Sequence, residues 1–300
     1  MTSPRVQFSL PDLLLLLVVF IWGSNFSVVK AALESMPPLG FNAVRLVIAS
    51  SVLVVVARRA GFGLPAREDW QRLLALGLAG HCGYQLTFVA GLARTSVTNS
   101  SLIAGCLPVT VLLLNTLSRH RERVGRLQWV GVGLAFVGLY LVVGAGAQVS
   151  RDSLVGDLLV IVSVCCWGWY TVGSRRLLER YSPLQITACT MAIGTIAFLP
   201  FGVPSLVTTD WGQVGVWAWV GLVASGLLAL SLCHVLWYVG VQRLGGARTA
   251  LYSNLIPVVA MSVAAVTLRE PIGTAKLVGA ALVLCALALT RVERLSLRES

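Results

Sequence analysis

Long apolar stretches alternate with short polar segments along almost the whole chain. Ten such stretches, each of roughly 18 to 26 residues, are bounded by Arg, Pro or Gly. An α-helix rises ~1.5 Å per residue, so each stretch is long enough to cross the ~30 Å hydrocarbon core of a bilayer. The predicted spans are residues 12–32, 38–57, 72–92, 97–117, 125–145, 155–174, 184–204, 215–240, 248–268 and 273–290. The pattern therefore predicts an all-α integral membrane protein with ten transmembrane helices.

The composition agrees with a membrane protein and disfavours a soluble one. Of the 300 residues, 57% are hydrophobic and 12% are charged, whereas a soluble domain carries about 25% charged residues. The net charge of +11 does not indicate a nucleic-acid partner, because the cations lie in short clusters between apolar stretches and not on one basic face. All seven cysteines lie in apolar stretches without metal-site spacing. We expect a lipid bilayer around the chain, and no metal or cofactor.

The distribution of lysine and arginine predicts the orientation in the membrane. With the N-terminus in the cytoplasm, 17 of the 23 cations fall in cytoplasmic segments, four fall outside, and Lys30 and Arg45 lie within spans. Membrane proteins concentrate positive charge on the cytoplasmic side. We therefore expect a multi-pass protein of the plasma (inner) membrane with both termini in the cytoplasm. No clear signal-peptide cleavage site follows the first apolar stretch, which we interpret as a retained helix.

The two halves of the chain resemble each other. A shift of 145 positions aligns the start of the halves, and a shift of 149 aligns them further along. The matched pairs are Asp12 with Asp157, Trp22 with Trp167, Gly23 with Gly168, Lys30 with Arg175, Pro38 with Pro183, Gly91 with Gly240, Arg94 with Arg243 and Pro108 with Pro257. We expect repeats at residues 1–148 and 149–300. Five spans per repeat is an odd number, so the fold is predicted to be two inverted five-helix repeats with substrate between them near the midplane.

Paired motifs in the two halves also carry a family resemblance. An Asp-x9-Trp-Gly motif begins at Asp12 and again at Asp157, cations end spans one and six, and residues 99–108 match residues 248–257. With these motifs the chain resembles the EamA family of the drug/metabolite transporter superfamily. Arg269-Glu270-Pro271 is similar to the family's acidic residue before the last helix. The resemblance implies ten helices, a cavity bordered by spans one and six, and transport of a solute that the motifs do not identify.

Polar and aromatic side chains within the spans are the candidate substrate-binding residues. A polar group in lipid is costly, so these side chains are expected to face the interior of the bundle. In spans three and eight, spacings of three and four residues place them on one helical face. The candidates are Trp22, Asn25, Arg45, His81, Tyr84, Gln85, Asn99, Trp167, Tyr170, His234, Trp237, Tyr238, Tyr252 and Asn254. The alternative is that they join neighbouring helices by packing and hydrogen bonds.

Two cations and two prolines within spans raise separate hypotheses. Arg45, about two turns into span two, would hold a substrate carboxylate if it faces the cavity. Lys30 reaches the outer headgroups, pairs with Glu34 one turn later, or faces the cavity and holds a substrate carboxylate as well. Pro108 and Pro257 are candidate gating residues, because a proline leaves a carbonyl about one turn earlier unpaired and bends the helix.

Three functions are open at this stage. The first is a secondary transporter that exports a small amphipathic metabolite such as an amino acid, with a nucleoside, sugar or drug-like solute as the alternative. The second is an intramembrane enzyme, which would need a nucleophile with its base, a His-Glu-x-x-His pair or intramembrane acids, and no such set is visible. The third is a non-transporting scaffold, which would not need polar faces in both halves.

Two further observations restrict the function. We expect no Asp or Glu deep within a span, which disfavours antiport of cationic drugs against protons. Spans five and ten are rich in glycine, and Gly131-x-x-x-Ala135 is a small-residue packing motif. This motif indicates either internal helix contact or a homodimer.

Overall fold

The computed structural model describes residues 10–117, 129–131, 133–134, 137–138, 141, 150–275, 277–282 and 284–286, and these residues form helices without any strand. Eight helical segments in this part of the chain are long and apolar enough to cross a membrane. They are Leu10–Ala32, Pro38–Arg59, Arg67–Arg94, Val97–Leu114, Arg151–Leu178, Pro183–Thr208, Val216–Leu244 and Arg248–Thr267. They match predicted spans one to four and six to nine. Most of predicted span five and the boundary at 148–149 fall outside the described residues, whereas predicted span ten corresponds in part to a shorter apolar helix, Leu277–Ala286.

Several spans consist of more than one helical element. In chain order the elements are α1 (Leu10–Ala32), α2 (Pro38–Arg59), the 3-10 helix η1 (Arg67–Asp69), α3 (Trp70–Gly77), the π-helix η2 (Leu78–Gly83), α4 (Tyr84–Arg94), α5 (Val97–Gly105), α6 (Leu107–Leu117), α8 (Arg151–Gly173), α9 (Arg175–Leu178), α10 (Pro183–Thr208), the 3-10 helix η3 (Trp211–Gln213), α11 (Val216–Ala224), the π-helix η4 (Ser225–Leu232), α12 (Cys233–Leu244), α13 (Gly246–Tyr252), the 3-10 helix η5 (Ser253–Leu255) and α14 (Ile256–Thr267).

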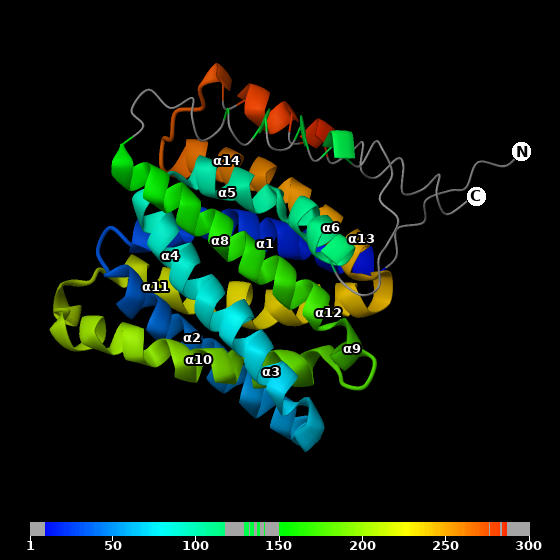
Figure 1. Cartoon of the computed structure of the whole chain (residues 1–300). Coiled ribbons are helices and arrows are strands. Elements are labelled where there is room, and N and C mark those ends of the chain that lie inside the picture. The colour runs from blue at the N-terminus through cyan, green and yellow to red at the C-terminus, as the bar shows by residue number, and fades with distance from the viewer. Residues whose placement is uncertain are drawn as a thin grey trace, which may run out of the picture.

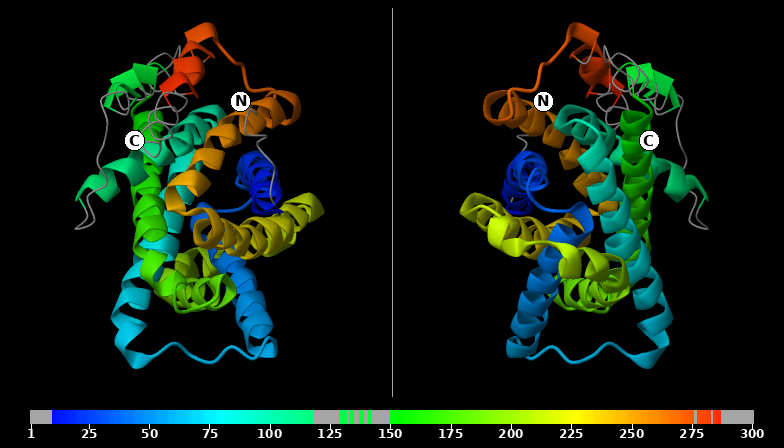
Figure 2. Two further views of the ribbon diagram at one scale, coloured as in Figure 1. Left: turned by 90° about the vertical axis from the view of Figure 1, so that its right-hand side faces the viewer. Right: turned by 90° about the vertical axis from the view of Figure 1, so that its left-hand side faces the viewer.

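The helices pack into one bundle with α1 near its middle (Figure 1). α1 contacts α12 and α14, α8 contacts α4 and α6, and α2 packs along α10. α1 begins beside α13, whereas α8 begins where α4 ends, so α1 and α8 run in opposite directions (Figure 1). Figure 2 shows the segment 60–66 crossing from α2 to α3 outside the bundle.

The outer surface of the bundle is apolar. The exposed fraction is 82% for Trp217, 82% for Val266 and 80% for Val207. Apolar side chains this exposed are unfavourable in water but not against lipid tails. The helices therefore present the surface expected of a multi-pass membrane protein.

The two halves place the same irregularities at matching positions. α2 begins at Pro38 and α10 at Pro183, 145 residues later. The π-helices end at Gly83 and Leu232, 149 residues apart, and π-helical turns are uncommon in proteins. Span four is interrupted at Cys106 and span nine within Ser253–Leu255. The repeated sequence thus folds into repeated structure, including its departures from a regular helix.

Glycines permit the closest contacts between helices, again in matched pairs. A methyl group added to Gly91 would lie 2.8 Å from the carbonyl oxygen of Gly156 on α8. At the equivalent position, one added to Gly240 would lie 2.8 Å from the side chain of Leu15 on α1. Real carbon contacts are longer than this, so the backbones approach closely only because a Cβ is absent. The shared Gly91 and Gly240 of the sequence repeat therefore have a packing role.

Gly91→Ala tests this contact. Alanine favours a helix over glycine by about 1 kcal/mol, but the added methyl meets a backbone carbonyl that cannot move independently, and overpacking costs about 1–3 kcal/mol. We expect the midpoint of thermal unfolding in detergent to fall. Gly63→Ala is the control, since nothing lies within 4 Å of its added methyl. A rise in the Gly91→Ala midpoint would show that α4 and α8 separate easily.

Candidate functional site

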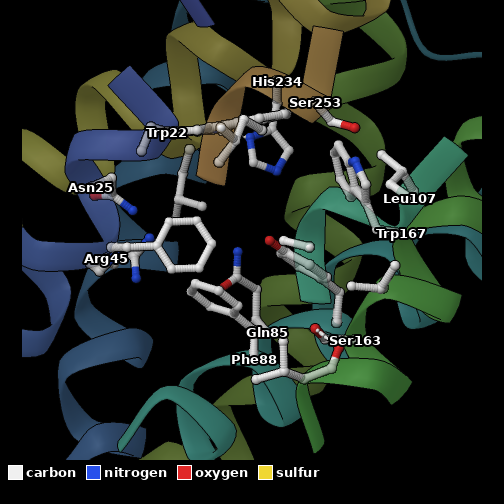
Figure 3. Close-up of a pocket in the computed structure, with 18 residues that line it drawn as sticks. Trp22, Asn25, Arg45, Gln85, Phe88, Leu107, Ser163, Trp167, His234 and Ser253 are labelled. Carbon is white, nitrogen blue, oxygen red and sulfur yellow. Dashed lines mark hydrogen bonds between the residues drawn. The ribbon is translucent and has the colours of Figure 1, made fainter. Parts of the chain in front are cut away.

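A cavity lies inside the bundle between helices of both halves (Figure 3). Its cavity volume is about 60 Å³. Seven predicted site residues line it: Trp22, Asn25, Arg45, Tyr84, Gln85, Trp167 and His234. The other lining residues are Phe26, Phe88, Ala104, Leu107, Val160, Ser163, Val164, Ala229, Leu230, Ser253 and Ile256. Most of these are apolar, so the few polar groups can orient a ligand.

Aromatic rings from four spans form a continuous part of the cavity wall. The ring centroids of Trp22 and Trp167 lie 5.7 Å apart in an edge-to-face arrangement. Trp167 also contacts His234 at 4.9 Å and Tyr84 at 5.3 Å. Tyr84 stacks on Phe88 with 5.5 Å between centroids. Ring pairs at such distances attract each other beyond the effect of burial, so this wall is held in shape before any ligand arrives.

The π-helix η4 contributes a carbonyl that orients two of these rings. The carbonyl oxygen of Ala229 accepts hydrogen bonds from Trp22 Nε1 at 2.9 Å and from His234 Nδ1 at 3.0 Å. A carbonyl only accepts, so Nδ1 of His234 carries the hydrogen. In the neutral ring Nε2 is then an acceptor, and it is buried without a partner. Figure 3 shows the His234 ring pointing into the cavity, so a lone pair is available there.

Arg45 adds a cation to the cavity wall. Its exposed fraction is 1%, and Nη1 donates to Asn42 Oδ1 at 3.2 Å. The guanidinium lies 5.2 Å from the centroid of Phe41. Nε has no hydrogen-bond partner, and no ion pair with Arg45 occurs among the described residues. Gln85 Oε1 is likewise buried without a partner. Three polar groups at this cavity therefore retain unused hydrogen-bonding capacity.

Four predicted residues lie behind the cavity wall instead of lining it. His81 Nε2 is 2.9 Å from Tyr170 Oη and 3.2 Å from Thr190 Oγ1. Tyr238 stacks on Tyr170, and Trp237 contacts Trp22. The prediction for His81 assumed a regular helix, but the π-helix η2 has a wider turn than an α-helix, so His81 leaves the face of Tyr84 and Gln85.

Two further candidates bind buried aspartates at opposite ends of the bundle. Asp12 accepts hydrogen bonds from Arg248, at 2.9 Å, and from Tyr252. Asp157 accepts from Thr95, at 2.6 Å, and from Asn99, at 3.2 Å. Residues 99 and 248 are equivalent under the 149-residue shift, so the repeat builds the same contact twice. Asn254 is half-buried and does not line the cavity either.

Asp157 lies further from the start of its helix than the sequence pattern predicts, although it remains near one end of the bundle. Asp157 is 1% exposed and is the seventh residue of α8, which begins at Arg151. The sequence pattern set the start of this span at residue 155, because Arg151 and Asp152 resemble a loop. Their helix starts earlier since Ser150 caps it by accepting from the backbone N–H of Ser153.

Lys30 contacts neither Glu34 nor the cavity, which corrects those two hypotheses for it. Its Nζ donates to the carbonyl oxygens of Leu92, Ala93 and Thr95 at 2.9, 3.2 and 2.7 Å. A cation at the C-terminus of α4 satisfies carbonyls that have no partner within the helix. Close by, the Glu270 carboxylate accepts from the backbone N–H groups of Val97 and Thr98 at 2.7 and 3.0 Å. The two charges therefore cap the end of one span and the start of the next.

Some of the lining residues that sequence reasoning missed could have been found from the sequence, and others could not. Val160, Ser163 and Val164 lie seven, four and three residues before Trp167, so helical periodicity from that tryptophan identifies them. Phe26 lies four residues after Trp22 and follows in the same way. Ala104 and Leu107 flank the interruption of span four at Cys106 and carry no polar or aromatic signal. Only the structure places them at the cavity.

Known proteins match this chain over nearly its whole length. The model of the EamA-like transporter family matches residues 9–144 and 154–292. The uncharacterized transporter YyaM of Bacillus subtilis is 26% identical over 267 residues, covering 87% of each chain. A probable terminal-alkyne amino-acid exporter of Streptantibioticus cattleyicolor is 29% identical, covering 89% of each chain. A probable amino-acid metabolite efflux pump of Salmonella typhimurium is 24% identical, covering 91% of this chain and 92% of its own.

A solved crystal structure shares the fold. It superimposes with a TM-score of 0.70 at 18% sequence identity, covering 95% of this chain and 99% of the other.

Replacing Lys30 tests its capping role. Lys30→Met removes a charged donor from three carbonyls, and a hydrogen bond to a charged group contributes about 1.5–3 kcal/mol. We expect a lower midpoint of thermal unfolding in detergent. Arg175→Met at the matching, exposed position should change little. An unchanged midpoint for Lys30→Met would instead favour an interaction with lipid headgroups.

Proposed function

Because the chain belongs to the EamA-like transporter family, we propose that it is a secondary transporter that exports a small amphipathic metabolite, with an amino acid as the first candidate. One observation carries the proposal: a cavity within the bundle, lined from both halves, that combines a ring wall with unpartnered polar atoms. Two relatives whose names refer to amino-acid export support the solute class. A nucleoside, a sugar or a drug-like solute is the alternative.

Alternating access is the mechanism that an inverted repeat supports. In this proposal the halves are related by a pseudo-twofold axis in the membrane plane, with both termini in the cytoplasm. The opposite directions of α1 and α8 support the inversion. When the two halves exchange conformations, an outward-open arrangement becomes an inward-open one. The solute enters the cavity from one side of the membrane and is released to the opposite side.

The interruptions of spans four and nine are the proposed hinges. Pro108 is the second residue of α6, and Pro257 is the second residue of α14. A methyl group added to Gly105 would lie 2.8 Å from Pro257 Cγ, so the two interruptions pack against each other. Ala104 and Ser253 line the cavity at these points. Bending there would move part of the cavity wall without unfolding a helix.

The two aspartate contacts are proposed to keep the cavity closed, one at each end of the bundle, and are called locks below. The Asp12 cluster joins the start of α1 to α13 at the cytoplasmic end, and the Asp157 cluster joins α8 to α5 at the outer end. A cavity can open toward one side only if the contact on that side separates. The repeat thus supplies one lock for each side.

Transport itself can be measured in proteoliposomes. We expect counterflow of at least one labelled solute from a panel of amino acids, nucleosides and sugars. Trp167→Ala should lower its rate about tenfold or more, the effect of ~1.4 kcal/mol, because it removes a ring from the cavity wall. Trp217→Ala is the matched control on the lipid-facing surface. Signals equal to those of empty vesicles for the entire panel would contradict the proposal.

The locks can be tested by labelling from one side. In a chain whose native cysteines are replaced, Ser253→Cys puts a thiol in the cavity wall for a charged maleimide. We expect Asp12→Asn to raise labelling several-fold from the cytoplasmic side and Asp157→Asn to raise it from the outer side, since a lost charge-assisted hydrogen bond contributes about 1.5–3 kcal/mol. Equal labelling in both variants and the parent would show that these contacts do not close the cavity.

A further inference from the structure

Resting on the proposed transport function, we propose that the cavity binds the zwitterionic form of an α-amino acid with an apolar side chain. Arg45 holds the carboxylate, the acceptors on His234 and Gln85 receive the ammonium group, and the ring wall contacts the side chain. Each part of this assignment follows from a different unmet requirement of the cavity.

The first requirement is an anion near Arg45. A guanidinium buried within a membrane-spanning bundle is costly unless an opposite charge or several hydrogen-bond acceptors surround it. The described residues supply one neutral acceptor, on Asn42, and one aromatic ring. A carboxylate fits the planar fork of arginine with two parallel hydrogen bonds. A carboxylate on the solute would therefore provide the charge that the surrounding protein lacks.

The second requirement is a donor for two buried acceptors. His234 Nε2 has its lone pair free because Nδ1 carries the hydrogen, and Gln85 Oε1 has no partner. A solute that is only a carboxylate would leave both acceptors unsatisfied. An ammonium group has three donors. A carboxylate and an ammonium group on one small solute together define an amino acid.

The third requirement concerns the apolar remainder of the solute. Trp22, Trp167 and Tyr84 form a wall of rings in the same cavity, and Figure 3 shows Trp167 across the cavity from Arg45. A charged or strongly hydrated side chain would lose water there without compensation. An aromatic or branched apolar side chain would instead gain ring contacts. Phenylalanine, with its apolar ring, is therefore a suitable probe.

The geometry also predicts that an analogue lacking one of the two charged groups binds more weakly than phenylalanine. A simple amine such as 2-phenylethylamine places a cation near Arg45 without a carboxylate, which is repulsive. 3-Phenylpropanoate satisfies Arg45 but offers no donor to His234 or Gln85. Both should therefore compete less well than phenylalanine itself, although all three carry the same ring.

The experiment measures inhibition of labelled L-phenylalanine counterflow in proteoliposomes by these two analogues and by unlabelled phenylalanine. We expect each analogue to bind at least about tenfold more weakly than phenylalanine, ~1.4 kcal/mol. Inhibition by 2-phenylethylamine that equals inhibition by phenylalanine would overturn the role of the carboxylate. This comparison uses the unaltered chain, so it does not depend on the folding of any variant.

Variants then assign the carboxylate to Arg45. Arg45→Gln should raise the half-saturating phenylalanine concentration at least about tenfold, with an unchanged elution profile in detergent, and Arg45→Lys should retain part of the affinity because it keeps the charge but not the fork. Arg58→Gln, exposed at the end of the same helix, is the matched control. Normal affinity in Arg45→Gln would overturn the assignment.

The two levels of the proposal fail in different ways. Counterflow of a nucleoside or a sugar, without counterflow of any amino acid, would overturn this inference and leave the transport function standing. Absence of counterflow for every solute in the panel would contradict both.

Discussion

The structure depends on the cost of leaving a polar group unpaired where no water can reach it. Within this bundle several buried polar side chains have a partner on another segment, as Asp157 has in Thr95 and Asn99. Lys30 has found three carbonyl oxygens at the end of α4. Such contacts join helices that apolar packing alone would let slide, because lipid tails are as apolar as leucine. Arg45, Gln85 and His234 also keep an unpartnered atom, and all three line the cavity.

The same constraint explains why the repeat is more exact in its backbone than in its polar chemistry. Interruptions, π-helices and close glycine contacts recur at equivalent positions in both halves. The polar contacts recur in position but differ in kind: Asp12 contacts a cation, whereas its counterpart Asp157 contacts a hydroxyl and an amide. The polar lining of the cavity also differs between the halves, because Arg45 on α2 lines it and the residue 145 positions later, on α10, does not. Backbone symmetry supports motion between two arrangements, and chemical asymmetry gives the bound solute a preferred orientation.

Much of the fold is predictable from the sequence, because apolar length and loop charge follow directly from the bilayer. Eight predicted spans correspond to helices in the structure, with boundaries displaced by a few residues. The site is less predictable, since helical periodicity fails where the helix is irregular. Tyr84 and Gln85 lie on the expected face, but His81, in the π-helix, does not. The role of Lys30 was equally hidden, because its partners are backbone carbonyls 62 to 65 residues away.

The aromatic wall has an optical consequence. Three of the nine tryptophans, Trp22, Trp167 and Trp237, contact one another with ring centroids 5.3 to 6.1 Å apart. Indoles at this separation couple their electronic transitions, and near-ultraviolet circular dichroism reports such fixed ring packing. Part of the near-ultraviolet circular dichroism of the folded protein therefore arises at the cavity, so the native chain carries an optical signal that responds to the packing of its interior.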